Sequence, residues 1–181
     1  MKRAIIMTVL LFALIGQAAA STTVSVNDTT GAKGKTAEVL LNIEGASALG
    51  SMDIVLKYDP SVLSAMTVEG KDLGGNAYIE SNTANNGEVV IALADSRGIN
   101  GNGAFAAITF EVMGNVGSTS PLTFEKVSAN NIDLAGISTT TKGGMFKVTS
   151  EAPPEAGDGN VVLAIIAVFT ALFLIRKKRK E

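Results

Sequence analysis

The chain has 181 residues and contains no His, no Cys and no Trp. The absence of His removes the commonest general base and the commonest metal ligand. The absence of Cys removes disulfides, thiolate nucleophiles and thiolate zinc sites. The residue types present do not exclude a catalytic pair of carboxylates like that of a glycosidase. We nevertheless expect that this protein is not an enzyme. The length leaves room for one domain of ordinary size.

The first twenty residues have the three parts of a secretory signal peptide. Lys2 and Arg3 precede an apolar run over residues 4–15, and three alanines then end the segment at Ala20. Small residues in this position are typical of a signal cleavage site. We therefore predict cleavage between Ala20 and Ser21, with an uncleaved membrane helix as the alternative.

The last thirty residues predict a membrane anchor. Residues 151–160 are rich in Pro, Gly and acids, residues 161–175 are apolar apart from one Thr, and residues 176–181 contain five basic residues. Fifteen residues are fewer than the roughly 20 that span a bilayer, but Arg176 can snorkel to the interface. By the positive-inside rule, residues 21–160 lie outside. The alternatives are a buried soluble helix and a sorting tail that is cut after export.

Charge excludes some partners of the exported segment. Two of the 15 basic residues lie in the signal and five in the tail, which leaves eight; one of the 17 acidic residues lies in the tail, which leaves 16. The segment is therefore at about −8, which excludes nucleic acid and suits a basic partner or cations. The loop acids lack the calcium-loop pattern of alternating Asp, so we predict no metal and no other cofactor in this chain.

Residues 21–150 predict an all-β domain. Apolar residues alternate with polar ones over residues 37–43, 51–58, 88–94 and 106–112, and shorter strands are expected at residues 22–26, 62–68, 77–81, 122–124 and 144–148. Turn signals separate the runs, among them Asp59-Pro60, Asn86-Gly87 and the Asn/Gly stretch at 100–103. Many short strands with regular turns favour an antiparallel β-sandwich.

The segment from Gly50 to Leu63, GSMDIVLKYDPSVL, resembles the signature of cohesin domains. Residues 30–39, 92–96, 103–112 and 143–148 are similar to further cohesin landmarks and follow the same order. The resemblance implies a jelly-roll sandwich of about nine strands. It also implies a non-catalytic module that binds dockerins, small helical domains on other proteins such as polysaccharide-degrading enzymes. Any calcium is then expected in the dockerin and not in this chain.

The resemblance places the dockerin-binding residues on one flat sheet face. Ser51 and Asp53 match a polar pair of the family, with Ser where Asn is often found, and Ala92 and residues 95–98 match the other side of the face. Independently of the resemblance, the period of two in these strands predicts that small apolar residues also point away from the core. They are then exposed unless a loop covers them. The predicted partner-binding residues are Ser51, Asp53, Val55, Val90, Ala92, Ala94, Asp95 and Gly98.

Two other functions remain alternatives. A carbohydrate-binding module would stack polysaccharide on aromatic rings, and only Tyr78 and Phe105 are expected to be free for this. An adhesive or structural surface domain would need no dockerin. The predicted organisation is a signal peptide (1–20), a cohesin-like domain (21–150), a linker (151–160), a transmembrane helix (161–175) and a basic cytoplasmic tail (176–181), in a protein exported and membrane-anchored at the cell surface.

Overall fold

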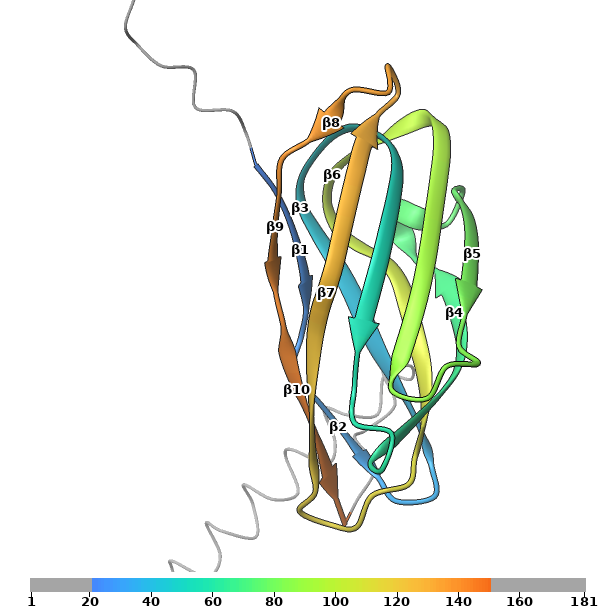
Figure 1. Cartoon of the computed structure of the whole chain (residues 1–181), viewed down its shortest axis with the longest axis vertical. Helices are drawn as coiled ribbons and strands as arrows, with labels where there is room; N and C mark the ends of the chain where they lie inside the picture. The colour runs from blue at the N-terminus through green and yellow to red at the C-terminus, as the bar shows by residue number, and fades with distance from the viewer. Residues whose placement is uncertain (1–20, 151–181) are drawn as a thin grey trace, which may run out of the picture.

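A computed structural model describes residues 21–150, which are almost entirely β-structure (Figure 1). The predicted signal peptide, linker, membrane helix and tail lie outside the described residues. Within residues 21–150, no helix has the length and apolar character needed to cross a membrane. The all-β prediction is therefore confirmed for the domain.

Ten strands and one short 3-10 helix make up the described part of the chain. In chain order they are β1 (Thr22–Val26), β2 (Thr29–Ala32), β3 (Thr36–Lys57), β4 (Leu63–Gly70), η1 (Asp72–Gly74), β5 (Tyr78–Asn82), β6 (Glu88–Val112), β7 (Thr119–Asn131), β8 (Gly136–Ile137), β9 (Thr139–Lys142) and β10 (Gly144–Thr149).

The strands form two layers, and β3 and β6 run through both of them (Figure 1). The front layer pairs β5 with the first part of β6, that part with the end of β3, and the end of β3 with β7. The back layer pairs β9 with β1, β1 with the start of β3, and β3 with the second part of β6, which pairs with β4. β10 lies between β7 and β2.

The two long strands correct the strand prediction. The runs 37–43 and 51–58 were expected as separate strands, as were 88–94 and 106–112, with a loop at 100–103. In the structure each pair is one strand, and the register shifts at several points between Leu41 and Ser51. Gly101 and Gly103 have φ angles of 106° and 149°, which glycine adopts without a steric penalty. They therefore bend β6 from one layer to the other without ending its pairing.

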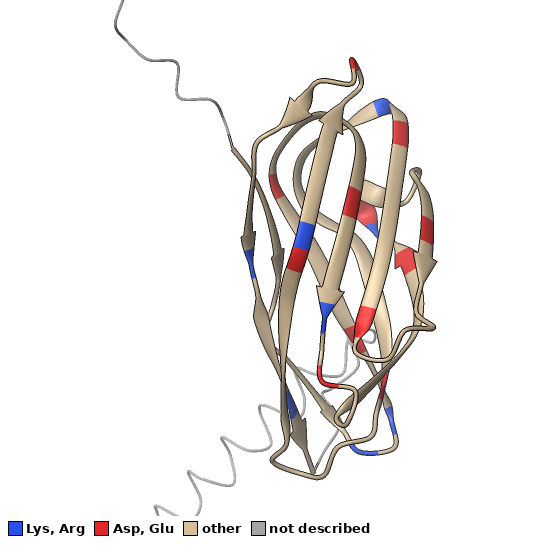
Figure 2. Cartoon of the chain, in the orientation of Figure 1, with Lys and Arg blue, Asp and Glu red and all other residues tan. Residues whose placement is uncertain are grey.

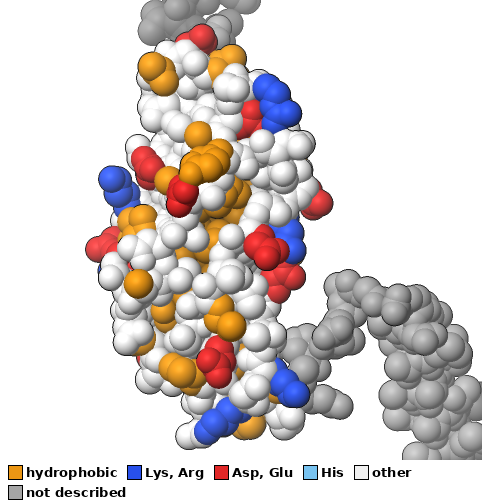
Figure 3. All heavy atoms as spheres, turned by 90° about the vertical axis from the view of Figure 1, so that its right-hand side faces the viewer, with side chains coloured by type: hydrophobic (Ala, Val, Ile, Leu, Met, Phe, Trp, Pro, Cys, Tyr) orange, Lys and Arg blue, Asp and Glu red, His pale blue; other side chains and the backbone are white. Residues whose placement is uncertain are grey.

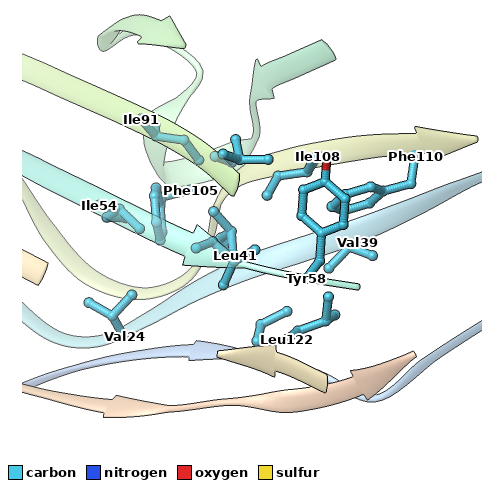
Figure 4. Close-up of a cluster of buried hydrophobic side chains, with 14 of the residues drawn as sticks. Val24, Val39, Leu41, Ile54, Tyr58, Ile91, Phe105, Ile108, Phe110 and Leu122 are labelled. Carbon is cyan, nitrogen blue, oxygen red and sulfur yellow. The ribbon is translucent and has the colours of Figure 1, made fainter. Parts of the chain in front are cut away.

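The core lies between the layers and follows the predicted alternation. Ile54 and Leu56 are fully buried, as is Phe110, whose ring meets the edge of Tyr58 with centroids 5.1 Å apart (Figure 4). Ala107 was expected to face outward but is 3% exposed, since it lies in the middle of the back layer with neighbours on both sides.

Phe105 corrects a functional expectation as well. It was expected to be free for stacking on a sugar, but it is fully buried and points into the core (Figure 4). Its carbonyl accepts a hydrogen bond of 3.0 Å from the amide of Lys71, just before η1. The short helix η1 therefore lies against this point of β6.

The shorter elements are partly as expected. β1 has the predicted bounds, and Gly87, with a φ angle of 82°, turns the chain between β5 and β6 as the Asn-Gly signal predicts. The Asp59 carboxylate accepts hydrogen bonds from the amide and hydroxyl of Ser61, which confirms the turn after β3. The short strands β2, β8 and β9 were not predicted, and β7 is much longer than the expected 122–124.

Candidate binding surface

The outward side of the front layer presents rows of side chains whose order follows from the strand register. We call this surface the front face. From the upper end in Figure 1 downward, its rows are Tyr78, Ala94, Ser51 and Asn130; then Glu80, Ala92, Asp53 and Ser128; then Asn82, Val90, Val55 and Lys126; and last Glu88, Lys57 and Thr123.

Six of the eight predicted binding residues lie together in the middle of the front face. Ser51, Asp53 and Val55 of β3 lie directly opposite Ala94, Ala92 and Val90 of β6. Asp53, Ala92 and Ala94 are exposed and the other three are half-buried. No segment within residues 21–150 covers the strip, so its small side chains form a flat surface that a partner can approach closely.

The other two predicted residues, Asp95 and Gly98, lie at the upper end of the face. The carboxylate of Asp95 accepts hydrogen bonds from the amide, Nε and Nη2 of Arg97, and these hold the pKa of Asp95 below its usual range. Only 8% of the Asp95 side chain is exposed. Arg97 also donates to the carbonyl of Asn76 at 3.2 Å, so this acid organises a turn and its carboxylate is occupied. Gly98 packs against Ala48 and has a φ angle of 79°.

Two acids flank the central alanine of the face. Asp53 on β3 and Glu80 on β5 lie opposite Ala92 on either side, which places them two strand spacings, or about 10 Å, apart. Glu80 accepts a hydrogen bond from the hydroxyl of Tyr78, which raises the pKa of that phenol. Within residues 21–150, neither Asp53 nor Glu80 takes part in an ion pair. This row can therefore accept hydrogen bonds from hydroxyl or cationic groups of a partner.

The lower end of the front face carries compensated charge (Figure 2). Lys57 forms ion pairs with Glu88 and, at 3.0 Å, with Glu125. Its hydrogen bond to Glu88 raises the pKa of Lys57 and lowers that of Glu88. The charged side chains of the front face that form no ion pair within the described residues are therefore Asp53, Glu80 and, one row below them, Lys126.

The side of the molecule that β4 and β5 line is also partly apolar (Figure 3). Hydrophobic side chains run along the middle of this view and acidic groups flank them. Met66 of β4 is 49% exposed, and Ile79 of β5 packs against the core. Tyr78 is 65% exposed, and among residues 21–150 it is the one large aromatic side chain that is exposed. A flat aromatic platform for sugars would need a second ring, and Phe105 is buried.

Several residues of the front face were missed as partner-binding residues in the sequence. Glu80 lies on the edge strand β5 beside Tyr78, which was expected to be free only for stacking on a sugar, and Lys126 and Asn130 lie on β7. The alternation of Val127 and Ala129 with polar residues could have revealed the full length of β7. Two apolar residues of the loop after β7 are also exposed, Ile132 by 46% and Leu134 by 83%.

The acidic side chains of the described domain are spread over its surface (Figure 2). Within residues 21–150, no three acidic side chains come close enough together to hold a metal ion. The loop acids have other roles, since Asp28 accepts a hydrogen bond of 2.8 Å from the amide of Met145 and Asp95 holds Arg97. The surface offers hydrogen-bond acceptors and flat apolar area, which suit protein binding.

Comparison with solved structures gives the same architecture. A non-cellulosomal cohesin from the hyperthermophilic archaeon Archaeoglobus fulgidus is 27% identical, with a TM-score of 0.66 over 72% of this chain and 93% of that one. The cohesin CaCohA2 of Clostridium acetobutylicum is 23% identical, with a TM-score of 0.65 over 75% of this chain and 95% of that one. A type I cohesin–dockerin complex from Clostridium thermocellum contains a chain that is 21% identical, with a TM-score of 0.64 over 74% and 97%.

Family assignment rests on the sequence as well as the fold. No protein of curated function matches the chain. The model of the cohesin domain matches residues 22–148, which is nearly the whole described domain. This chain therefore belongs to the cohesin domain family, a family of non-catalytic binding modules.

Proposed function

We propose that this protein is a docking module that binds dockerin-bearing proteins through the front face and holds them at the cell surface. The observation that carries the proposal is the uncovered strip of Ala92, Ala94 and Val90, with Asp53 and Glu80 on either side. Small exposed side chains, with acids beside them that form no ion pair in the described domain, suit a closely packed protein partner.

The known complexes of similar chains support this assignment. The Clostridium thermocellum chain was solved with the dockerin Doc435, and CaCohA2 was solved with CaDoc0917. These facts concern those proteins, which share the fold of this chain at 21% and 23% identity. Together with the family assignment, these complexes support a dockerin as the partner of this chain.

The front face would bind without chemical change in the partner. Its flat centre lets a partner helix approach the backbone of β6, and the carboxylates of Asp53 and Glu80 accept hydrogen bonds from hydroxyl, Lys or Arg groups. Charged groups on the rim affect the association rate, whereas groups that become buried affect the dissociation rate. The absence of His and Cys in the chain agrees with a non-catalytic role.

Anchoring at the surface is the second half of the proposal. Its support is the order of segments in the sequence: a signal peptide over residues 1–20, the domain, a ten-residue linker, an apolar run over residues 161–175 and five basic residues. With this arrangement the domain lies outside the cell and the basic tail inside.

A capture experiment tests the docking. Residues 21–150 are immobilised and exposed to the secreted proteins of the source organism with calcium, and then washed with chelator. We expect capture of a protein that contains a dockerin module, and its release by chelator. A captured set without such a module, or one that chelator leaves bound, would contradict the proposal.

Two variants locate the contact. Ala92→Arg introduces a long side chain at the centre of the strip, and we expect the affinity to fall more than about 100-fold, since the side chain blocks the close approach of a partner and occupies the acids beside it. Asp53→Asn keeps the shape and removes the charge, and we expect a loss of about tenfold. Thr67→Arg, on an exposed position of β4 in the back layer, is the matched control and should bind normally. Normal binding by Ala92→Arg would place the contact elsewhere.

A further inference from the structure

Three segments meet at the lower end of the molecule, where the described chain ends (Figure 1). They are the turn at residues 33–35, the loop at residues 113–117 and the end of β10 at residues 147–149, which together we call the lower tip. The amide of Gly117 donates to the carbonyl of Val148 at 2.9 Å, and Lys33 Nζ donates to Asn115 Oδ1 at 2.7 Å. The lower tip is therefore one connected surface.

The lower tip is basic although the domain is acidic (Figure 2). Residues 21–150 contain eight Lys and Arg against 13 Asp and Glu, a net charge of −5. Three of the eight basic residues, Lys33, Lys35 and Lys147, lie at the lower tip and are exposed. None of the three takes part in an ion pair within the described residues. Their charge is available to an anionic surface.

Exposed apolar side chains accompany these lysines. Val116 is 63% exposed in the loop after β6, and Met113 at the start of the loop is 43% exposed. The turn is closed by a hydrogen bond of 2.9 Å from the amide of Ser118 to the carbonyl of Asn115. Cationic side chains beside exposed apolar ones are the combination that binds the headgroup layer of a membrane.

The position of the chain end connects the lower tip to the predicted anchor. β10 ends at Thr149 beside the 113–117 loop. Eleven residues, 150–160, separate this end from the apolar run 161–175, and eleven residues span at most about 40 Å when fully extended. The lower tip is thus the end of the domain that a membrane anchor would hold nearest to the bilayer.

We propose that the lower tip rests on the anionic headgroup surface of the anchoring membrane and sets the orientation of the domain. The inference rests on the anchoring half of the proposed function. Each lysine close to an anionic surface strengthens the contact by about fivefold, and the tether supplies a high effective concentration, so a weak contact suffices. The acidic remainder of the domain is repelled by the same surface.

The orientation has a consequence for docking. With the lower tip on the membrane, the row of Lys57 and Glu88 is nearest to the lipid, and the row of Tyr78 and Ala94 is farthest from it. The front face then stands upright, and a partner reaches Asp53 from the side without meeting the bilayer.

Single-cysteine labelling tests the contact, because the native chain has no Cys. The mature chain, residues 21–181, is reconstituted in vesicles of phosphatidylcholine alone or mixed with phosphatidylglycerol. A fluorophore at Val116→Cys reports proximity to a quencher on the lipid headgroups, and one at Leu134→Cys, in the exposed loop at the opposite end, is the reference. We expect strong quenching at position 116 in the anionic vesicles and weak quenching at position 134.

Charge variants separate a specific contact from general attraction. In Lys35→Glu, we expect the ratio of contacting to free domain to fall by about fivefold or more. Lys142→Glu changes the net charge equally at an exposed residue of β9, outside both the lower tip and the front face, and should leave the quenching at position 116 unchanged.

Several outcomes would overturn the inference. Equal quenching at positions 116 and 134 would do so, as would equal loss in the two charge variants or the same quenching in vesicles of phosphatidylcholine alone. Failure of the chain to float with the vesicles would refute the anchor itself. Dockerin capture by the same preparation is scored separately, so a failed tip contact with normal capture refutes the orientation and leaves docking standing.

Discussion

Two adjacent glycines before β5 offer a sharp test of how the front face is held in place. Gly74, the last residue of η1, is buried against β6, and a Cβ added there would lie 1.9 Å from the carbonyl oxygen of Phe105. Gly75 is exposed, and its Cβ would lie 3.5 Å from the carbonyl oxygen of Asp72, an ordinary contact. The same substitution, Gly→Ala, should therefore have opposite effects at the two positions.

The magnitude follows from what must move. In Gly74→Ala the new methyl is more than an ångström too close to a backbone atom of a buried residue, and overpacking of this kind costs about 1–3 kcal/mol. The Phe105 carbonyl also accepts the Lys71 amide at 3.0 Å, and loss of that buried bond costs about 1–3 kcal/mol more. We expect Gly74→Ala to lower the free energy of unfolding by about 3 kcal/mol. Gly75 has φ −63° and ψ −19°, which Ala adopts readily, so Gly75→Ala should stabilise by about 0.4–1 kcal/mol.

Urea unfolding of residues 21–150, followed by far-UV circular dichroism, measures both effects. Because η1 leads directly into β5, Gly74→Ala should also displace Tyr78 and Glu80 and weaken dockerin capture. If Gly74→Ala unfolds within about 0.5 kcal/mol of the native sequence, the close packing of η1 on β6 is wrong. Destabilisation by Gly75→Ala as large as that by Gly74→Ala would refute the argument from φ and contact distance.

Three further predictions concern stability. Hydrogen bonds from Lys57, Ser61 and Arg97 lower the pKa values of Glu88, Asp59 and Asp95, respectively. The stability that these carboxylates provide is therefore present above their ordinary pKa values, 4.5 for Glu and 3.8 for Asp, and is lost as the pH falls below them. Melting temperatures measured from pH 6 down to about pH 2 should show this fall, with a shallower slope in Asp95→Asn. Phe105→Ala, at a fully buried position, should cost about 3–5 kcal/mol in urea unfolding. Leu134 has a φ angle of 61°, which Asn tolerates better, so Leu134→Asn should gain about 1 kcal/mol, seen as a higher melting temperature.

Much of the fold and the centre of the site could be predicted because the central strands obey a period of two. In residues 51–58 every second side chain is apolar, so one pattern assigns Ile54 to the core and Asp53 to the surface, and the structure agrees. The positions of Ala92 and Ala94 follow from the same argument on β6. The sequence cannot say which strands are neighbours, so the pairing of Asp53 with Ala92 came only with the register.

The errors have physical causes. Glycine-rich stretches predict turns, but in β3 and β6 they allow bulges that keep the strand paired while it changes layer. β9 is a run of three Thr and a Lys that pairs in parallel with β1, and no local pattern signals a partner more than 100 residues away. Phe105 looked free because alternation with the inward Ala106 places it outside, but the register shifts at this point of β6, where Leu41 pairs with Ala106 and Asn42 with Ala104, and Phe105 is fully buried.

The dimensions of the front face imply that the proposed docking uses more than its four rows. Four strands about 4.8 Å apart and a length of about 20 Å give roughly 400 Å² in projection, whereas a stable interface takes about 800 Å² from each partner. In the lower row the charge of Lys57 is already paired with Glu88 and Glu125, and we expect the additional area at the upper end. There Asn130 leads directly into the loop with Ile132 and Leu134, which are 46% and 83% exposed. We expect a partner that covers Ala94 and extends upward to bury both side chains.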